Sequence, residues 1–210
     1  MITVFGGWPS RSQRVLWLLE ELGTPYAFHP VDLRTRRSDP EFMSANAAGF
    51  LPAIADGEAR LCESVAIMEY LLARHGPTPL APPPADPAFA RYQQFLHLGE
   101  AGLAAYLNIV VASRFFAPEA ERRNWGAETA VGMFFNRLTL VAARLATSAH
   151  LTGEDFTAAD ISVCYALELG ERLGLAERYD PHVSAYMRRL AGREAYQRAL
   201  AVSPPRSLTT

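Results

Sequence analysis

The chain has 210 residues, of which half are hydrophobic and a fifth are charged. This is the balance of a soluble globular protein, and the length allows one domain or two small ones. The formal net charge of −2 offers no basic surface for nucleic acid. No stretch approaches the roughly 18 uninterrupted apolar residues of a membrane span, and the first residues lack the pattern of a secretory signal. We therefore expect a cytoplasmic protein that binds neither nucleic acid nor a membrane.

The residue types that bind metals are scattered along the chain. Cys62 and Cys164 are far apart in apolar surroundings, which favours two buried free thiols over a disulfide. No two of the five histidines lie within four positions of each other, and no cysteine joins them at ligand spacing. We expect no metal site.

The first fifty residues predict a strand, a helix and a second strand. Residues 2–5 have strand composition, and from Val15 the apolar residues follow helical spacing until Gly23. Residues 26–31 form the next expected strand, and this order favours a parallel pair with a right-handed crossover. Asp39 and the proline after it have the cap chemistry that opens a short helix.

A hairpin is expected next. Residues 51–55 and 59–62 read as two short strands joined by a turn at Asp56-Gly57, which is a strong hairpin signal. The second strand runs directly into Glu63-Ser64, a polar pair ahead of a helical stretch at residues 65–74.

This hairpin carries groups that suit a small ligand. Pro52 can hold a cis bond cheaply, and a bent entry would present the backbone N–H and C=O of Leu51. Ser64 has the place of a helix cap, and the same N-terminus can hold a carboxylate, while Glu63 can pair with an amine. Together these are the needs of a short peptide with a free α-amino acid end, although a simple capped helix is the better explanation of Glu63 and Ser64 when they are taken alone.

The second half is all helical by pattern. Residues 76–87 contain six prolines in twelve positions, which excludes helix and predicts an extended linker. Two long amphipathic helices follow, at 89–110 and 131–145. Thr157-Ala-Ala-Asp160 forms a capping box with Asp in place of Glu, which we assign to folding and not to catalysis. From Pro181 we expect two short helices and then a loose end at 203–210.

Two linked motifs identify a resemblance. Gly49-Phe-Leu-Pro52, followed by Glu63-Ser64-Val-Ala-Ile-Met-Glu-Tyr-Leu71, resembles the glutathione-binding half of the cytosolic glutathione transferase family, in a serine-type, bacterial-like form. The segment from Gly153 to Ile161 resembles the family's helix-start motif. The resemblance implies an α/β thioredoxin-like N-terminal domain with a cis Pro52, a proline-rich linker and an all-α helical bundle C-terminal domain. It also implies glutathione as co-substrate and a homodimer. The expected bounds are 1–75, 76–86 and 87–210.

The family reading places catalysis at the turn that opens the first helix. No cysteine lies between Gly7 and Val15, which disfavours an oxidoreductase using its own thiol. A substrate thiol here would become a thiolate more easily, because the helix dipole and a hydroxyl donor are each worth roughly 0.5–2 kcal/mol. Together they bring a thiol pKa of about 8.5 toward neutrality. We expect Ser10, at the helix cap, to be the donor, with Ser12 as the alternate; a backbone N–H and a purely capping Ser10 remain open.

Two departures from the family pattern concern this site. Many serine-type relatives carry the hydroxyl residue one place earlier, where this chain has Pro9. Relatives often carry Lys or Gln where Phe50 stands, to reach the glycine end of glutathione. Arg36 or Arg37 is the candidate substitute, although the sequence favours a solvated basic loop at this position.

The second substrate is expected to be a small hydrophobic electrophile, as in detoxification. Its candidate wall is aromatic, although aromatic residues at helical spacing are more often core. A glutathione-dependent isomerase, dehalogenase or peroxidase on the same scaffold is a rival enzyme class. A non-catalytic binding protein with this fold is another. The wall candidates are Trp8, Tyr106, Phe115 and Phe116.

Overall fold

The structure is a computed structural model and describes residues 1–122 and 124–204. These residues form two compact units. The first contains residues 1–78 and also residues 191–204, and the second is Pro79–Leu190. The loose end expected at the C-terminus falls largely outside the described residues.

A four-stranded sheet forms the centre of the first unit. Its strands are β1 (Ile2–Gly6), β2 (Tyr26–Pro30), β3 (Ala53–Asp56) and β4 (Ala59–Cys62), in the order β2-β1-β3-β4. The pair β1/β2 is parallel, as the strand–helix–strand order predicts, and the other pairs are antiparallel. The predicted hairpin is confirmed, but its turn residues are Gly57 and Glu58, because Asp56 still pairs with Ala59.

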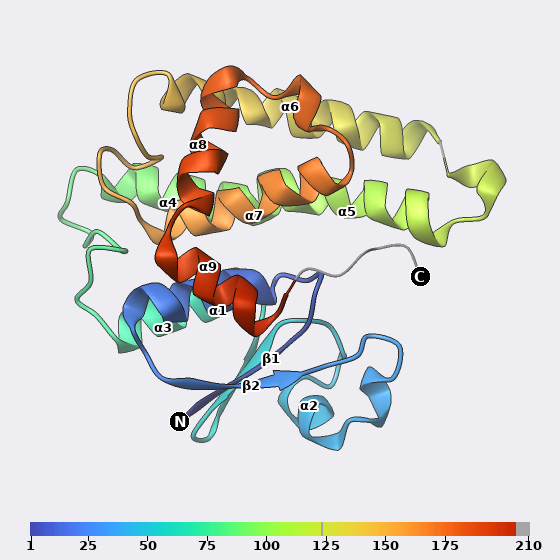
Figure 1. The fold of residues 1–210 in the computed structure, drawn as a ribbon, viewed down its shortest axis with the longest axis vertical. Helices are drawn as coiled ribbons and strands as arrows, with labels where there is room; N and C mark the ends of the chain where they lie inside the picture. Colours follow the sequence, from blue (N-terminus) through green and yellow to red (C-terminus); the bar gives the residue numbers. More distant parts are fainter. Residues whose placement is uncertain (123, 205–210) are drawn as a thin grey trace. The chain divides into compact units, whose positions relative to one another are not determined.

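Helices cover both faces of this sheet. Helices α1 (Ser12–Leu22) and α3 (Ser64–Arg74) lie on one face, and α2 (Pro40–Ala45) lies on the other (Figure 1). Helix α1 ends at Gly23, whose φ of 61° is the left-handed conformation that glycine adopts without penalty. Asp39 caps α2, since its carboxylate accepts the N–H of Phe42 at 3.0 Å. This arrangement is the predicted thioredoxin-like α/β domain.

The second unit is helical, as predicted. Helix α4 (Phe89–His97) continues without a break through a π-helical stretch (Leu98–Ala104), α5 (Ala105–Val111) and a second π-helical stretch (Ala112–Phe116). Helices α6 (Trp125–Leu145), α7 (Ala158–Arg172) and α8 (Pro181–Ala191) complete the unit.

Helix α7 packs closely against the long helix at one glycine. A Cβ at Gly99 would lie only 2.4 Å from Ser162 Oγ, so only glycine fits there. The Ser162 hydroxyl donates to the carbonyl of Leu96 at 2.7 Å. The predicted capping box is present at the start of α7, where the Asp160 carboxylate accepts the Thr157 N–H at 2.8 Å.

The long helix Phe89–Phe116 has the length and apolar composition of a membrane span. A core helix of a soluble protein meets the same criterion, so a single helix of this kind is weak evidence for a membrane.

The linker and the chain end differ from the sequence prediction. Residues 76–87 contain no helix, as expected, but they form turns instead of an extended segment, and Leu80 is buried with its carbonyl accepting the N–H of Ala158. Helix α9 (Glu194–Val202) packs against α1 and so belongs to the first unit. The sequence pattern placed it in the second domain, because a helical periodicity does not specify which partner the helix covers.

Candidate active site

Two serines lie at the turn between β1 and α1. Their hydroxyl oxygens are 2.7 Å apart, and Ser10 Oγ also accepts the N–H of Ser12 at 3.2 Å. Ser12 Oγ accepts the N–H of Gly7 at 3.3 Å and lies 3.4 Å from the Gly7 carbonyl oxygen. Both side chains are buried, with exposed fractions of 8% for Ser10 and 0% for Ser12. The expectation that Ser10 is the helix cap is wrong: Arg11 occupies the N-cap position, and Ser10 precedes it.

The direction of one proton decides what Ser10 can do. If Ser12 donates to Ser10, the Ser10 hydroxyl can still donate its proton to a ligand. If Ser10 donates to Ser12, the Ser10 proton is already used in a hydrogen bond within the protein. Ser12 has one proton, and its two acceptors are Ser10 Oγ at 2.7 Å and the Gly7 carbonyl at 3.4 Å. The 2.7 Å contact exists whichever hydroxyl donates, so the arrangement in which the Ser10 proton is free is one of the two that this geometry allows.

The segment before β3 presents an open backbone. The Leu51–Pro52 peptide bond is cis, which confirms the expectation for Pro52. Among the described residues, none forms a hydrogen bond with the backbone N–H or C=O of Leu51. The neighbouring Phe50 carbonyl, in contrast, accepts the side-chain amide of Asn46 at 2.7 Å. Leu51 is therefore where this segment can pair with an extended ligand.

The start of α3 is open in the same way. Glu63 is the N-cap residue, but its side chain makes no capping bond and is exposed. Its φ of 70° and ψ of 108° lie where a non-glycine residue costs roughly 1–3 kcal/mol, which is a feature that clusters at ligand sites. The expectation that Ser64 is the cap is wrong, because Ser64 is the first helical residue; it is buried, with 1% exposed.

One residue that the sequence analysis missed contacts this pair. Arg14 on α1 has a completely buried side chain, and its Nη1 donates to Ser64 Oγ at 3.1 Å. The available signal was its position, one helical turn before the apolar Leu18, which puts a guanidinium on the buried face of α1.

The two arginines proposed for the glycine end differ from each other. Arg36 is half-buried and donates through Nη1 to the carbonyl of Leu33, while its buried Nε has no hydrogen-bond partner in the described part of the chain. A Cβ at Gly49 would lie 3.8 Å from this Nε, so Arg36 is next to the Gly49-to-Pro52 segment. Arg37 is exposed. The side chain of Phe50 is 39% exposed and offers no charge.

The expected aromatic wall is divided between the two units. Trp8 is half-buried in the first unit. In the second unit, Arg137 stacks over the ring of Tyr106 at 4.5 Å, and the side chains of Phe115 and Phe116 are 45% and 81% exposed. A common wall formed by these four residues stays a prediction.

Neither cysteine suggests catalysis by a protein thiol. Both are free, but Cys62 is half-buried instead of buried as expected. Burial raises the pKa of the Cys164 thiol well above its ordinary value, and the nearby Glu168 raises it further. Within the described residues, no group of three or more His, Cys, Asp or Glu side chains gathers as a metal site would require.

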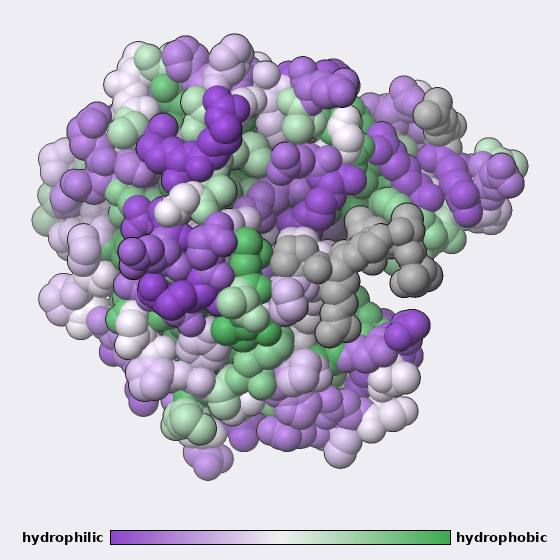
Figure 2. Space-filling view, in the orientation of Figure 1, coloured by the Kyte–Doolittle hydropathy of each residue, from purple (hydrophilic) through white to green (hydrophobic). Residues whose placement is uncertain are grey.

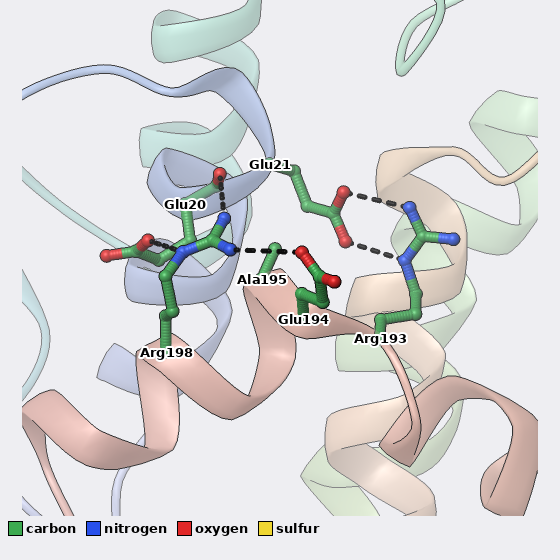
Figure 3. Close-up of a pocket in the computed structure, with 6 residues that line it drawn as sticks. All are labelled: Glu20, Glu21, Arg193, Glu194, Ala195 and Arg198. Atoms are coloured by element: carbon green, nitrogen blue, oxygen red, sulfur yellow. Dashed lines mark hydrogen bonds and ion pairs between the residues drawn. The ribbon is translucent and has the colours of Figure 1, made fainter.

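A groove of about 370 Å³ lies at the opposite end of α1 from the serines. Glu21 forms two hydrogen bonds with Arg193, at 2.7 and 2.9 Å, and Glu20 pairs with Arg198 at 2.7 Å (Figure 3). Hydrophilic residues gather on the surface where α9 begins (Figure 2). These charges pair with one another, and about 12 Å of helix separates Glu20 from Ser12, so the groove is not part of the predicted site.

Comparisons with known proteins agree with this geometry. The family model of the glutathione S-transferase N-terminal domain matches residues 1–73, and that of the C-terminal domain matches residues 105–194. A maleylacetoacetate isomerase of Rhizobium meliloti is 32% identical over 90% of this chain and 91% of its own length. The glutathione S-transferase 3 of Zea mays is 30% identical over 91% of this chain and 89% of its own.

The chain belongs to the glutathione transferase family. The fold agrees: a crystal structure of a glutathione transferase from Methylococcus capsulatus superimposes with a TM-score of 0.83, at 24% identity, over 96% of this chain and 98% of that one. Membership confirms the resemblance derived from the two motifs, together with glutathione as co-substrate and transfer to its sulfur as the reaction class. In this glutathione transferase, the serine-type assignment and the site residues stay predictions.

Proposed function

We propose that this glutathione transferase binds the tripeptide along Leu51 and Pro52 and holds its γ-glutamyl head at Glu63 and Ser64. The observation that carries the proposal is the pair of open positions, since Leu51 and Ser64 both present donors that no other described residue uses. An extended peptide pairs with the Leu51 backbone, the N-terminus of α3 attracts the carboxylate, and Glu63 attracts the amine.

The thiol then lies at the turn that opens α1, where Ser10 donates a hydrogen bond to the thiolate. Ser12 supports this role by donating to Ser10, so the Ser10 proton faces the sulfur. The thiolate attacks a small hydrophobic electrophile held by Trp8, Tyr106, Phe115 and Phe116. Arg36, with its unused Nε beside Gly49, is the proposed partner of the glycine carboxylate. We further propose a cytoplasmic homodimer that acts in detoxification.

A titration of the ultraviolet absorbance of bound glutathione thiolate tests the chemistry. In the wild-type protein we expect a thiol pKa lowered by about one to two units, and in Ser10→Ala a pKa that rises by about one unit, because each hydrogen bond to a charged group contributes roughly 1.5–3 kcal/mol. Ser12→Ala separates the two serines: it should raise the pKa less than Ser10→Ala. An unchanged pKa in Ser10→Ala would remove Ser10 from catalysis, and absence of bound thiolate near pH 7 in all forms would favour a non-catalytic binding protein.

A glutathione-dependent isomerase is the second candidate. The observation that favours it is the relative named maleylacetoacetate isomerase, which matches nearly the whole chain. Turnover of maleylacetoacetate, compared with an aryl halide, an alkyl halide and an organic hydroperoxide, separates isomerase, transferase, dehalogenase and peroxidase activity. The transferase proposal predicts the largest kcat/KM with the aryl halide.

A further inference from the structure

Arg14 connects the first turn of α1 to the start of α3. It follows Ser12 by two positions, its guanidinium is completely buried, and Nη1 donates to Ser64 Oγ at 3.1 Å. Burying a guanidinium costs several kcal/mol unless hydrogen bonds and charges compensate it. A hydrophobic residue would fill this place in α1 at lower cost, so the charge at this position requires an explanation.

The contact fixes the direction of the Ser64 proton. Arginine can only donate, whereas a serine hydroxyl has one proton and two lone pairs. One lone pair of Ser64 is therefore committed to Arg14, and its proton must point elsewhere. Within the described residues that proton has no acceptor. A buried hydroxyl that donates no hydrogen bond is energetically costly, and a ligand acceptor would satisfy it.

The positive charge also strengthens this donor. A hydroxyl that accepts a hydrogen bond from a cation is polarised, so it donates more strongly to an anion. The backbone N–H of Ser64, as the first residue of α3, has no partner within the helix. Ser64 therefore carries two unused donors, its hydroxyl and its backbone N–H, and Arg14 contacts the hydroxyl.

We propose that Arg14 is a positioning residue that orients the Ser64 hydroxyl toward the α-carboxylate of the γ-glutamyl head of glutathione. This inference rests on the proposed function, because Ser64 must hold that carboxylate. It assigns to Arg14 the selectivity for an anionic head group, and Arg14 itself does not contact the ligand. The alternative is that Arg14 only ties α1 to α3 and supports the fold.

Two ligands separate these roles. Cysteinylglycine lacks the γ-glutamyl head but keeps the cysteine and glycine of glutathione. The measured quantity is the ratio of the two dissociation constants, obtained by calorimetry for the wild type, Arg14→Gln, Ser64→Ala and the double variant. A partly unfolded sample weakens both ligands by the same factor, so the ratio is insensitive to lost folded protein.

We expect the wild type to bind glutathione at least 10-fold more tightly than cysteinylglycine. Arg14→Gln and Ser64→Ala should each reduce this ratio by about 5- to 20-fold, and the double variant should be within 2-fold of Ser64→Ala, because both act through one hydroxyl. A matched control is Arg193→Gln, which removes a bidentate ion pair of α1 with α9 away from Ser64 and should leave the ratio unchanged within 2-fold.

Different results would contradict this inference alone and the proposed function as a whole. If Arg14→Gln weakens both ligands equally, or if its effect multiplies with that of Ser64→Ala, Arg14 is structural and the inference is wrong while the proposed function stands. If the wild type itself does not prefer glutathione, the proposed binding site fails, and this inference fails with it.

If Arg14→Gln does not fold, a measurement that keeps Arg14 in place tests whether it positions Ser64. In protein with 15N-labelled arginine, a completely buried guanidinium exchanges its protons slowly and is recognised by that property. Glutathione should shift this signal in the wild type and leave it in place in Ser64→Ala, and cysteinylglycine should not shift it in either. A signal indifferent to glutathione would overturn the proposal.

Discussion

Helices α3 and α7 both begin at a buried polar side chain, but they satisfy it in opposite ways. At α7, the Asp160 carboxylate accepts four hydrogen bonds from the chain: from the N–H of Leu151 at 3.0 Å, the N–H and the hydroxyl of Thr157 at 2.8 and 3.2 Å, and the hydroxyl of Tyr186 at 2.8 Å. At α3, Ser64 receives one hydrogen bond from Arg14, and its own proton has no acceptor among the described residues.

We interpret this difference as that between a hydrogen-bond network that stabilises the fold and a helix start that we propose binds glutathione. The polar groups around Asp160 partner one another, so there is nothing left for a ligand, even though burial raises the pKa of this carboxyl against the opposing effect of its hydrogen bonds. The start of α3 keeps its donors unused and holds Glu63 at a costly φ of 70°. The two helix starts thus differ in their unused donors, and our proposed binding site rests on the unused donors at Ser64 and not on the motif.

The largest loss of stability should come from removing the hydrogen bonds of Asp160 at the start of α7. Asp160→Ala removes the acceptor of four buried donors, and each buried donor left without a partner costs roughly 1–3 kcal/mol. We expect the free energy of unfolding to fall by about 3–4 kcal/mol in urea denaturation. The control Asp155→Ala, at an exposed carboxylate of the same loop, should change it by less than about 0.5 kcal/mol. A loss below about 1 kcal/mol for Asp160→Ala would contradict the view that this network holds the fold.

The open start of α3 should respond to ligand instead. Glutathione at 100 times its Kd stabilises a protein by about 2.7 kcal/mol. If Ser64→Ala raises Kd by about tenfold, the same concentration stabilises the variant by only about 1.4 kcal/mol. Denaturation with and without glutathione measures both values. Ser44→Ala, at an exposed hydroxyl of α2, serves as control and should retain the full gain. An equal gain in Ser64→Ala and wild type would mean that the ligand binds elsewhere.

The elements that the sequence predicted are those set by nearby residues. The hairpin, the parallel β1/β2 pair, the helix expected at residues 65–74 and the Asp160 capping box each depend on spacings within one short segment. The π-helical stretches at 98–104 and 112–116 were not distinguishable, because apolar residues repeating at three and four positions suit an α-helix or a π-turn.

The parts of the site that were missed depend on residues far apart in sequence. Arg14 and Ser64 are 50 positions apart, and no local pattern links them. The same holds for α9, whose Arg193 pairs with Glu21 across 172 positions. Ser10 was correctly placed in the turn, but its contact with Ser12 depends on how the turn folds back onto Gly7. Local patterns thus indicated which segments carry the candidate ligand groups, and tertiary packing determined the contacts between them.

A smaller change in stability is expected from relieving the backbone strain at Glu63, at the start of α3. Glu63→Gly should remove the penalty of a positive φ and raise the free energy of unfolding by about 1 kcal/mol, since glycine adopts this conformation freely but loses some entropy on folding. It should also weaken glutathione binding, because the carboxylate that attracts the amine is gone. Chemical denaturation and calorimetry measure the two effects. Glu63→Gln is the matched control, with weaker binding and no gain in stability. A less stable Glu63→Gly protein would show that the backbone at Glu63 is not strained.

The smallest change in stability is expected at the start of α2, where the cap residue is hydrogen-bonded but partly exposed. Asp39 caps α2 through the N–H of Phe42, and this hydrogen bond, with a second from His29 at 2.8 Å, lowers the pKa of Asp39 below its ordinary value. Because the folded pKa is the lower one, the cap contributes stability above the unfolded pKa of about 3.9 and loses it as the pH falls through the folded pKa. Asn caps about as well and does not titrate, so Asp39→Asn should match the wild type within about 0.5 kcal/mol at pH 7 and lose less stability between about pH 4 and pH 2. Urea denaturation across this range measures the difference, and parallel acid profiles for the two proteins would show that this cap does not contribute to acid sensitivity.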